Sequence, residues 1–366
     1  MAAMRPTPMF SKVVIAGVGL IGGSIGLGIR QRFLADRVAG LDPDPEALDS
    51  ARWIGVIDDT HLEPGEWLRE ADLVILAAPV RTLTTLAGEL RPWLRPDAIV
   101  TDVGGVKADL VEAFRDLRFV GGHPMAGSER FGVSNADAAL LENAVWVLTP
   151  TDHTDQAALK QVEEFVTALG SRPLRVEPGQ HDRLVAAVSH VPYLMSLALT
   201  QLVAEDSDRD LLMLLAAGGF RDLTRVASGS PRMSRDMVVG NERAVRAALK
   251  QLLGHVERLE AQLEDPDSLL EQANRAKRTR DSMPIVRRSL LPQKFEITIA
   301  VPDQAGQLSI ITQALGAAGV NIKDIEVLGI REAGGAVRLA FDDEMGLRVG
   351  IQALKDAGYE VRGKGQ

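Results

Sequence analysis

The chain has 366 residues, 46% hydrophobic and 25% charged, which suits two or three domains with buried cores. Its formal net charge of −9 repels phosphate backbones, so we expect no nucleic-acid partner. The absence of cysteine excludes disulfides, thiolate ligands and cysteine nucleophiles, and we predict no metal site. The first ten residues lack a signal-peptide core, and no run reaches the roughly 18 apolar residues of a membrane span. We therefore predict a cytoplasmic protein without membrane contacts.

A glycine-rich segment follows the first predicted strand, residues 12–16. The sequence reads Gly-Val-Gly-Leu-Ile-Gly at positions 17–22 and continues as a predicted helix. Strand, glycine turn and helix in this order are typical of a dinucleotide-binding fold, because glycines let a pyrophosphate approach the helix N-terminus. We predict cofactor contacts from the residues of this loop: Gly17, Gly19, Leu20, Ile21 and Gly22.

An acidic residue, Asp42, ends the second predicted strand, which runs from Arg37 to Leu41. It lies about 20 residues beyond the third glycine, where this fingerprint places a carboxylate that accepts from the adenosine ribose hydroxyls. The same carboxylate would repel the extra phosphate of NADP. We therefore predict NAD as the cofactor, although Arg30 and Arg32 nearby, with Arg37, are of the type that binds a phosphate.

Three further strand-like runs, at residues 72–78, 98–101 and 118–122, alternate with helix-length segments. Repeated β-α units predict a doubly wound Rossmann-type α/β domain, which we place at residues 11–176. Ligands bind such sheets at the carboxyl ends of the strands. The loops at Pro79, at residues 102–107 and at His123 should therefore converge on one pocket, with Pro79 on the cofactor.

His123 comes directly after the last of these runs, and a neutral imidazole takes up a proton near physiological pH. We therefore predict that it is a functional residue. His190, beside a proline in an apolar segment, is a second candidate site residue. His181 fits a capping or ion-paired surface histidine equally well. Arg221 and Arg225, four residues apart on one predicted helical face, suit either a carboxylate clamp or ordinary ion pairs.

The middle of the chain, residues 177–288, has apolar residues at helical spacing, for example from Ala244 to Leu259. We predict an all-α domain whose broad apolar stripe serves helix packing or a dimer contact. A basic segment with two prolines, residues 277–294, then precedes a tail at residues 294–366. In that tail, strand and helix signals follow the order βαββαβ, which predicts a small α+β domain.

Five motifs together resemble those of bacterial prephenate dehydrogenases, and the resemblance spans nearly the whole chain. They lie at residues 17–24, 101–107, 121–129, 189–192 and 218–225. The resemblance implies oxidative decarboxylation of prephenate, in which hydride passes to NAD, carbon dioxide leaves and the ring becomes aromatic. It also implies that His123 takes the proton of the ring hydroxyl and that Arg225 binds a substrate carboxylate. His190, Ser128 and Glu129 would complete the substrate pocket.

Two positions depart from the family pattern. Gly105 stands where relatives commonly have a serine that assists the histidine, and Tyr193 stands where they often have another histidine. Arogenate, the transaminated form of prephenate, is therefore an alternative substrate, and a catalytically inactive sensor of NAD and amino acids is a rival from another class. A 3-hydroxyacid or 6-phosphogluconate type of dehydrogenase would place a lysine where this chain has Ser189 and His190.

The tail resembles an ACT domain, a module that binds small regulatory molecules. The resemblance implies that an aromatic amino acid, L-tyrosine above all, binds between paired modules near Asp303, Gly306 and Asn321, although Ala305 replaces the usual proline of that loop. The alternative is that the module only holds two chains together. Relatives dimerise through the helical domain, so the resemblance also implies a homodimer.

Overall fold

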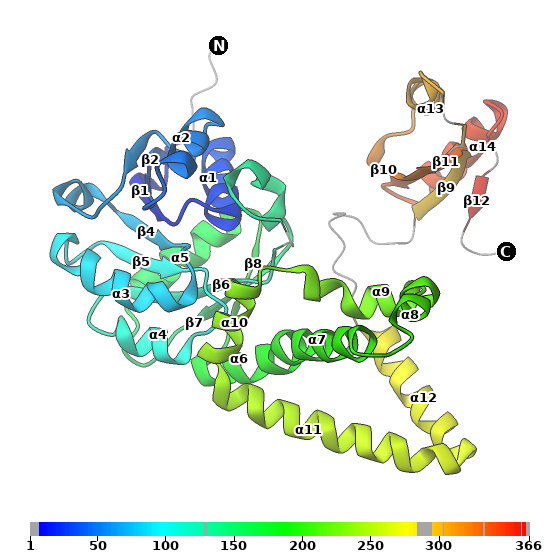
Figure 1. Cartoon of the computed structure of the whole chain (residues 1–366). Helices are drawn as coiled ribbons and strands as arrows, with labels where there is room; N and C mark the ends of the chain where they lie inside the picture. The colour runs from blue at the N-terminus through cyan, green and yellow to red at the C-terminus, as the bar shows by residue number, and fades with distance from the viewer. Residues whose placement is uncertain are drawn as a thin grey trace. The chain divides into compact units, whose positions relative to one another are not determined.

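The computed structural model describes residues 7–127, 130–283, 295–302, 304–331, 334–359 and 361–363, and Figure 1 shows the chain. Residue contacts divide the chain into two compact units, Met1–Pro284 and Ile285–Gln366. The first unit holds a large sheet and the long helices, and the second holds a small α/β module. The predicted Rossmann-type and helical domains therefore lie within one unit.

The large sheet has eight strands in the order β3-β2-β1-β4-β5-β6-β7-β8. Neighbouring strands are parallel except β6 and β7, which are antiparallel. The strands are β1 Phe10–Ala16, β2 Ala35–Leu41, β3 Asp59–His61, β4 Leu73–Leu76, β5 Ile99–Asp102, β6 Phe119–Pro124, β7 Val145–Thr149 and β8 Arg172–Arg175. The mostly parallel, doubly wound sheet was predicted from the sequence, whereas β3, β7 and β8 were not.

Successive side chains of the central strands point to opposite faces of the sheet and pack into two cores, one on each face. Val13 and Ile15 of β1 join one core, while Val14 and Ala16 join the other. Helices α1 and α5 cover the first face, and α3 and α4 cover the second. The helices of this domain are α1 Leu20–Arg32, α2 Pro45–Trp53, α3 Val80–Leu90, α4 Ala108–Ala113 and α5 Gln156–Ala168.

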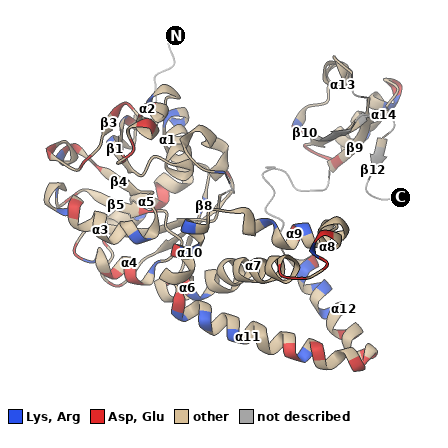
Figure 2. Cartoon of the chain, viewed as in Figure 1, with Lys and Arg blue, Asp and Glu red and all other residues tan. Residues whose placement is uncertain are grey.

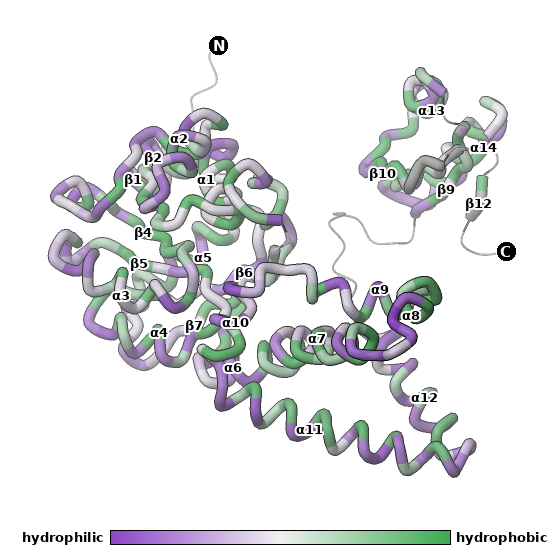
Figure 3. Tube along the Cα trace, in the orientation of Figure 1, coloured by the Kyte–Doolittle hydropathy of each residue, from purple (hydrophilic) through white to green (hydrophobic). Residues whose placement is uncertain are grey.

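The helical part of the first unit has a small buried core, built on Ala186, Val191 and Val245. Many of its leucines are exposed, among them Leu214 at 80%, and α7 and α8 are largely hydrophobic in Figure 3. Charged residues gather instead on α11 and α12 (Figure 2). The helices are α6 Pro178–Val185, α7 Val191–Ala204, α8 Arg209–Leu215, α9 Gly218–Thr224, α10 Pro231–Gly240, α11 Glu242–Ala261 and α12 Pro266–Ser282.

A π-turn, Ala186–His190, joins α6 to α7. In this turn the Val191 N–H bonds to the carbonyl of Ala186, five residues earlier. The next residue, Pro192, has no N–H to donate to the turn. Among the described residues, this helical run, Pro178–Ala204, is long and apolar enough to cross a membrane by length and composition alone. Core helices pass the same test, and His181, in its first half, is buried against the sheet domain.

The second unit is a four-stranded antiparallel sheet in the order β10-β11-β9-β12. Its elements are β9 Glu296–Val301, α13 Gln307–Ala317, β10 Ile322–Arg331, β11 Gly334–Phe341, α14 Glu344–Asp356 and β12 Val361–Gly363. Ile299, Ile311, Leu339 and Leu354 are fully buried in its core. The predicted βαββαβ order is confirmed.

Candidate active site

The glycine loop lies between β1 and α1, and its backbone leaves no room for most side chains. Gly17 has a φ of +101°, and a Cβ there would lie 2.5 Å from the backbone of Ala77. A Cβ on Gly22 would lie 2.1 Å from the Gly17 carbonyl oxygen. Gly19 instead faces open space and is the N-cap of α1, without a side-chain cap. The uncapped helix N-terminus therefore fits the pyrophosphate of a dinucleotide.

Asp42 follows β2 and braces this loop. One of its carboxylate oxygens accepts from the Val18 N–H at 2.8 Å, and the other accepts from the Asp44 N–H at 3.0 Å. The Asp42 N–H donates to the carbonyl of His61, which lines an open hollow of about 490 Å³. Both oxygens of the carboxylate are therefore held by backbone N–H groups, one of them in the glycine loop.

Arg30, Arg32 and Arg37, which are close to this acid in the sequence, lie away from it, at the end of α1 and the start of β2, and all three are paired with carboxylates. Arg30 pairs with Asp58, Arg32 with Glu142 at 2.6 Å, and Arg37 with Asp59 at 2.7 Å. These three guanidinium groups are therefore engaged away from Asp42, where a 2′-phosphate of NADP would need a cation. The arrangement therefore favours the unphosphorylated dinucleotide.

His123 lies within β6, paired with Val147 of β7, so its predicted position after the strand is wrong. The antiparallel partner strand extends β6 by two residues beyond the predicted end. His123 thereby keeps a strand backbone, and its ring is turned toward Gly105. A Cβ built on Gly105 would lie 3.7 Å from His123 Nε2.

A hydrogen-bond chain leads from His123 into the helical part. His123 Nδ1 lies 2.8 Å from His181 Nε2, and His181 Nδ1 lies 2.8 Å from a carboxylate oxygen of Asp182. The Asp182 carboxylate also accepts from the backbone N–H groups of Lys107 and Ala108, at 2.8 and 2.9 Å. Asp182 thus joins α6 to the N-terminus of α4.

His190 enters the same cluster through Asn241 at the start of α11. The Asn241 side-chain amide donates to the Asp182 carbonyl oxygen at 2.7 Å and lies 3.2 Å from His190 Nδ1. His181 and His190 are nine residues apart, about 180° around a regular α-helix. The π-turn between them has one extra residue, which takes about 100° off that angle. Both histidines can therefore face one cluster.

Beneath His123 lies a buried ion pair between Lys107 and Asp102, both without exposed surface. The Asp102 carboxylate also accepts from the N–H groups of Gly104 and Gly122, at 2.8 and 2.9 Å. Burial raises the pKa of Asp102 and lowers that of Lys107, and their mutual attraction opposes both shifts. The pair fixes the loop at 102–107 against the strand that carries His123.

Both site histidines are neutral at physiological pH. Burial, followed by the nearby His181, Lys107 and His190, holds the pKa of His123 well below 6.5. Burial likewise lowers the pKa of His190 to about 4. Burial raises the pKa of Asp182, but the hydrogen bonds from His181 and the α4 backbone outweigh it, so that pKa lies below its ordinary value. Asp182 is therefore ionised beside neutral imidazoles.

The remaining predicted residues lie outside this cluster or outside the described part of the chain. Arg225 is exposed at the start of a 3₁₀ turn that directly follows α9, and Arg221 is exposed on α9 itself. Pro79 is the exposed N-cap residue of α3. Ser128 and Glu129 lie outside the described residues, as does Asp303 of the tail.

Sequence reasoning gave His181 no preferred role and did not single out Asp182 or Asn241. The adjacent His181-Asp182 pair was the available signal, but its partner His123 is 58 residues away. Asn241 carries no local signal beyond its place before a helix. Only the packing of α6 and α11 against the sheet brings these side chains together.

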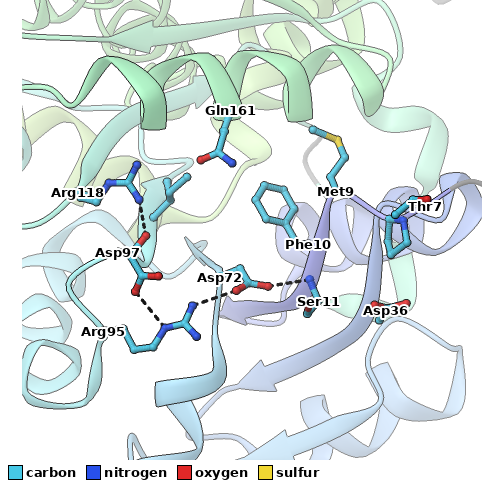
Figure 4. A pocket seen from close by; sticks show the side chains of 12 residues that line it. Thr7, Met9, Phe10, Ser11, Asp36, Asp72, Arg95, Asp97, Arg118 and Gln161 are labelled. Atoms are coloured by element: carbon cyan, nitrogen blue, oxygen red, sulfur yellow. Dashed lines mark hydrogen bonds and ion pairs between the residues drawn. The ribbon is translucent and has the colours of Figure 1, made fainter.

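A second hollow, of about 460 Å³, lies at the opposite ends of the strands (Figure 4). Its Arg95 pairs with Asp72 at 3.0 Å and with Asp97 at 3.2 Å, and Arg118 pairs with Asp155 at 2.9 Å. Sheets of this class bind ligands at the carboxyl ends of their strands. The carboxyl ends of the strands, which carry the glycine loop and His123, are therefore the candidate active site.

The fold and these side chains define an NAD-binding dehydrogenase, with a neutral histidine on a strand of the same sheet. A family model for the nucleotide-binding domain of prephenate dehydrogenase matches residues 25–174, and one for the dimerization domain of prephenate dehydrogenase matches residues 177–273. The chain belongs to the prephenate dehydrogenase family. It is an NAD-linked oxidoreductase of prephenate oxidative decarboxylation.

Individual relatives agree with this assignment. The prephenate dehydrogenase of Bacillus subtilis is 33% identical over 346 residues, covering 92% of this chain and 93% of that protein. The crystal structure of prephenate dehydrogenase from A. aeolicus in complex with hydroxyphenyl propionate and NAD+ covers 75% of this chain and 99% of that one, with a TM-score of 0.72 and 33% identity. A crystal structure of Synechocystis arogenate dehydrogenase has a TM-score of 0.66 and 31% identity, covering 74% of this chain and 99% of that one.

Proposed function

We propose that His123 is the general base of this reaction and that its Nε2 accepts the proton of the substrate ring hydroxyl. The observation that carries the proposal is the orientation of the ring. Nδ1 of His123 lies within hydrogen-bond distance of His181. Nε2 faces the space next to Gly105, at the edge of the sheet where the glycine loop also lies. A neutral imidazole in this position is ready to accept a proton.

The reaction balances with that single base. NAD, held by the glycine loop and Asp42, would supply the acceptor for the hydride that leaves the carbinol carbon of prephenate. His123 takes the hydroxyl proton as the carbon–oxygen bond gains double-bond character. The electron pair of the bond to the ring carboxylate then moves into the ring, carbon dioxide leaves, and His123 returns the proton to the phenolic oxygen of 4-hydroxyphenylpyruvate.

We assign substrate binding to His190, Arg225, Ser128 and Glu129. For His190 the support is the Asn241 amide, which can only donate a hydrogen bond to His190 Nδ1. His190 Nε2 then carries the ring proton and is a donor toward a substrate oxygen. For Arg225 the support is chemical, since a dicarboxylate needs a cation that binds both oxygens of a carboxyl group.

We also propose that Asp42 selects NAD over NADP, with Gly17, Gly19, Leu20, Ile21, Gly22 and Pro79 forming the rest of the cofactor site. The pairing of Arg30, Arg32 and Arg37 with carboxylates, away from Asp42, supports that choice. The test is nicotinamide reduction from prephenate and from arogenate, each with NAD and with NADP. Turnover with prephenate and NAD is expected. Preference for arogenate would revise the pocket, and NAD binding without any turnover would favour an inactive sensor.

We propose that the second unit is an ACT-like module at residues 294–366 that binds an aromatic amino acid. The first ligand to test is L-tyrosine. The support for this module is the βαββαβ order and the loop before α13, where Gly306 has a φ of +90°. Asn321, exposed directly before β10, lies at the position that the resemblance gives to the ligand. Suppression of turnover by tyrosine, lost in Asn321→Ala, would support this role. Equal turnover with and without tyrosine would oppose it.

We propose that two copies of the chain form a homodimer through the helical part. We also propose domain limits of 11–176 for the Rossmann-type domain and 177–288 for the helical domain. Its family match is a dimerization domain, and its exposed apolar side chains include Leu202, Leu214 and Leu215. Burial of such a surface against a second copy is favourable. Light scattering of the whole chain would show twice the chain mass. Location in the cytoplasm stays a prediction.

A further inference from the structure

We propose that His181 and Asp182 are positioning residues, which hold the proton of neutral His123 on Nδ1 and leave Nε2 bare to act as the base. The inference rests on the proposed role of His123 and deepens it. It gives a function to two buried side chains, 1% and 5% exposed, that the reaction itself does not touch.

The direction of the two hydrogen bonds, from His123 to His181 and from His181 to Asp182, follows from the carboxylate at which they end. An ionised carboxylate only accepts hydrogen bonds, so His181 Nδ1, 2.8 Å from Asp182, must carry a proton. When His181 carries this single proton, its lone pair lies on Nε2. His123 Nδ1, 2.8 Å from that lone pair, must therefore donate, and His123 Nε2 has no proton.

The opposite direction would disable the base. If His181 donated from Nε2, His123 Nδ1 would have to accept, and a neutral His123 would carry its proton on Nε2. That nitrogen could then no longer accept from a substrate hydroxyl. Asp182 disfavours the tautomer of His181 whose single proton is on Nε2, because the carboxylate accepts a hydrogen bond from Nδ1.

The carboxylate that directs the chain is itself held rigidly. Two backbone N–H groups at the N-terminus of α4, from Lys107 and Ala108, bind its oxygens, and their partial positive charge stabilises the anion. The other charged or titratable groups facing His123 are Lys107, paired with Asp102, and His190. The anion of Asp182 therefore also favours the imidazolium that forms transiently on His123 during turnover.

Glutamine and leucine at position 181 separate this role from simple packing. The two polar atoms of a glutamine amide can donate to Asp182 and accept from His123, as the two nitrogens of His181 do, whereas leucine fills the space without polar atoms. We expect His181→Leu to lower kcat about 100-fold, with KM for prephenate and affinity for NAD nearly unchanged. His181→Gln should retain most of kcat, and His153→Gln, at an exposed histidine, should retain all of it.

Ring-nitrogen NMR of histidine-labelled protein tests the inference without turnover. Signals that disappear in His123→Asn identify His123, and we expect a protonated Nδ1 and a bare Nε2 at neutral pH, both in the wild type and in His181→Gln. A proton on Nε2 of His123 would overturn the inference, as would equal losses of kcat in the glutamine and leucine variants. If the tautomer is as expected but His123→Asn retains full turnover, the proposed base has failed and the positioning geometry has not. Should His181→Leu fail to fold, the glutamine variant's tautomer and kcat decide.

Discussion

Gly105 lies directly against the catalytic histidine proposed here: a Cβ at this position would be 3.7 Å from His123 Nε2 and 3.8 Å from Met237. Both distances are ordinary van der Waals contacts, and the backbone at Gly105 has no positive φ. The space that a serine hydroxyl takes in relatives is therefore present in this chain. The departure from the family pattern leaves room beside the base without distorting it.

Gly105→Ser should fold as stably as the wild type and change turnover. Its hydroxyl would reach both His123 Nε2 and a substrate hydroxyl, so we expect kcat/KM for prephenate to rise severalfold, about 1 kcal/mol of transition-state stabilisation. Gly104→Ser is the matched control, because its Cβ would lie 2.9 Å from an Asp102 carboxylate oxygen. That control should lower the midpoint of unfolding. Severe destabilisation by Gly105→Ser would contradict the space described at this position.

Asp42→Asn should relax the preference for NAD over NADP. Removing the carboxylate removes its repulsion of a 2′-phosphate, and we expect the ratio of kcat/KM values to fall about tenfold, which equals about 1.4 kcal/mol. Thermal stability gives the control, since an asparagine oxygen can still accept from the Val18 N–H. An unchanged ratio in a folded variant would mean that Asp42 does not face the ribose.

Asn241→Leu should weaken substrate binding more than it slows chemistry. Without the amide, nothing described here holds the proton of His190 on Nε2, and the Asp182 carbonyl loses a donor. We expect KM for prephenate to rise about tenfold, with a loss of stability of about 1–3 kcal/mol from the buried carbonyl. Steady-state kinetics and denaturant unfolding measure the two effects. A lower kcat at constant KM would assign Asn241 to the chemical step instead.

The loss of kcat/KM on the acidic side of the pH profile should occur below pH 6.5, the ordinary pKa of histidine. Only neutral His123 accepts a proton, and burial, followed by the nearby His181, Lys107 and His190, holds its pKa well below 6.5. Lowering the pH to 6.5 should therefore leave kcat/KM nearly intact, and loss should begin only at lower pH. A profile that is half-maximal at or above pH 6.5 would contradict a buried, neutral base.

Folding stability should fall as the pH drops from about 6.5 toward about 4. Unfolded histidines gain a proton near 6.5, whereas folded His190, with a pKa of about 4, stays neutral. Each such histidine costs up to about 1.4 kcal/mol per pH unit in this window. Urea unfolding across the range measures the slope. His190→Gln should reduce the slope of the unfolding free energy against pH by the contribution of one histidine. An unchanged slope would contradict the burial of neutral His190.

The glycine loop, Asp42 and the central strands could be predicted because their signals are local. A β-branched run before Gly17, or an acid after β2, depends on a few neighbouring residues. Strand β8 gave no signal, because Arg-Pro-Leu-Arg at an exposed edge has no apolar alternation. Strand β3 is three residues long, too short for any pattern.

The arrangement around His123 could be predicted only in part. The histidines at 123 and 190 were found from their motifs, but the tautomer of each depends on His181 and Asn241, which tertiary packing supplies. The end of β6 was misjudged because its antiparallel neighbour β7 extends it through His123. Distant side chains of this kind leave no trace in a local pattern.

The most direct test of the account is kcat for prephenate in His123→Asn, measured together with NAD affinity. The asparagine amide can still donate to His181, so the fold and the dinucleotide site should persist. We expect kcat to fall about 1,000-fold, within the range of general-base catalysis, with NAD binding unchanged. A variant that binds NAD and turns over prephenate at the wild-type rate would contradict the central claim that His123 is the base.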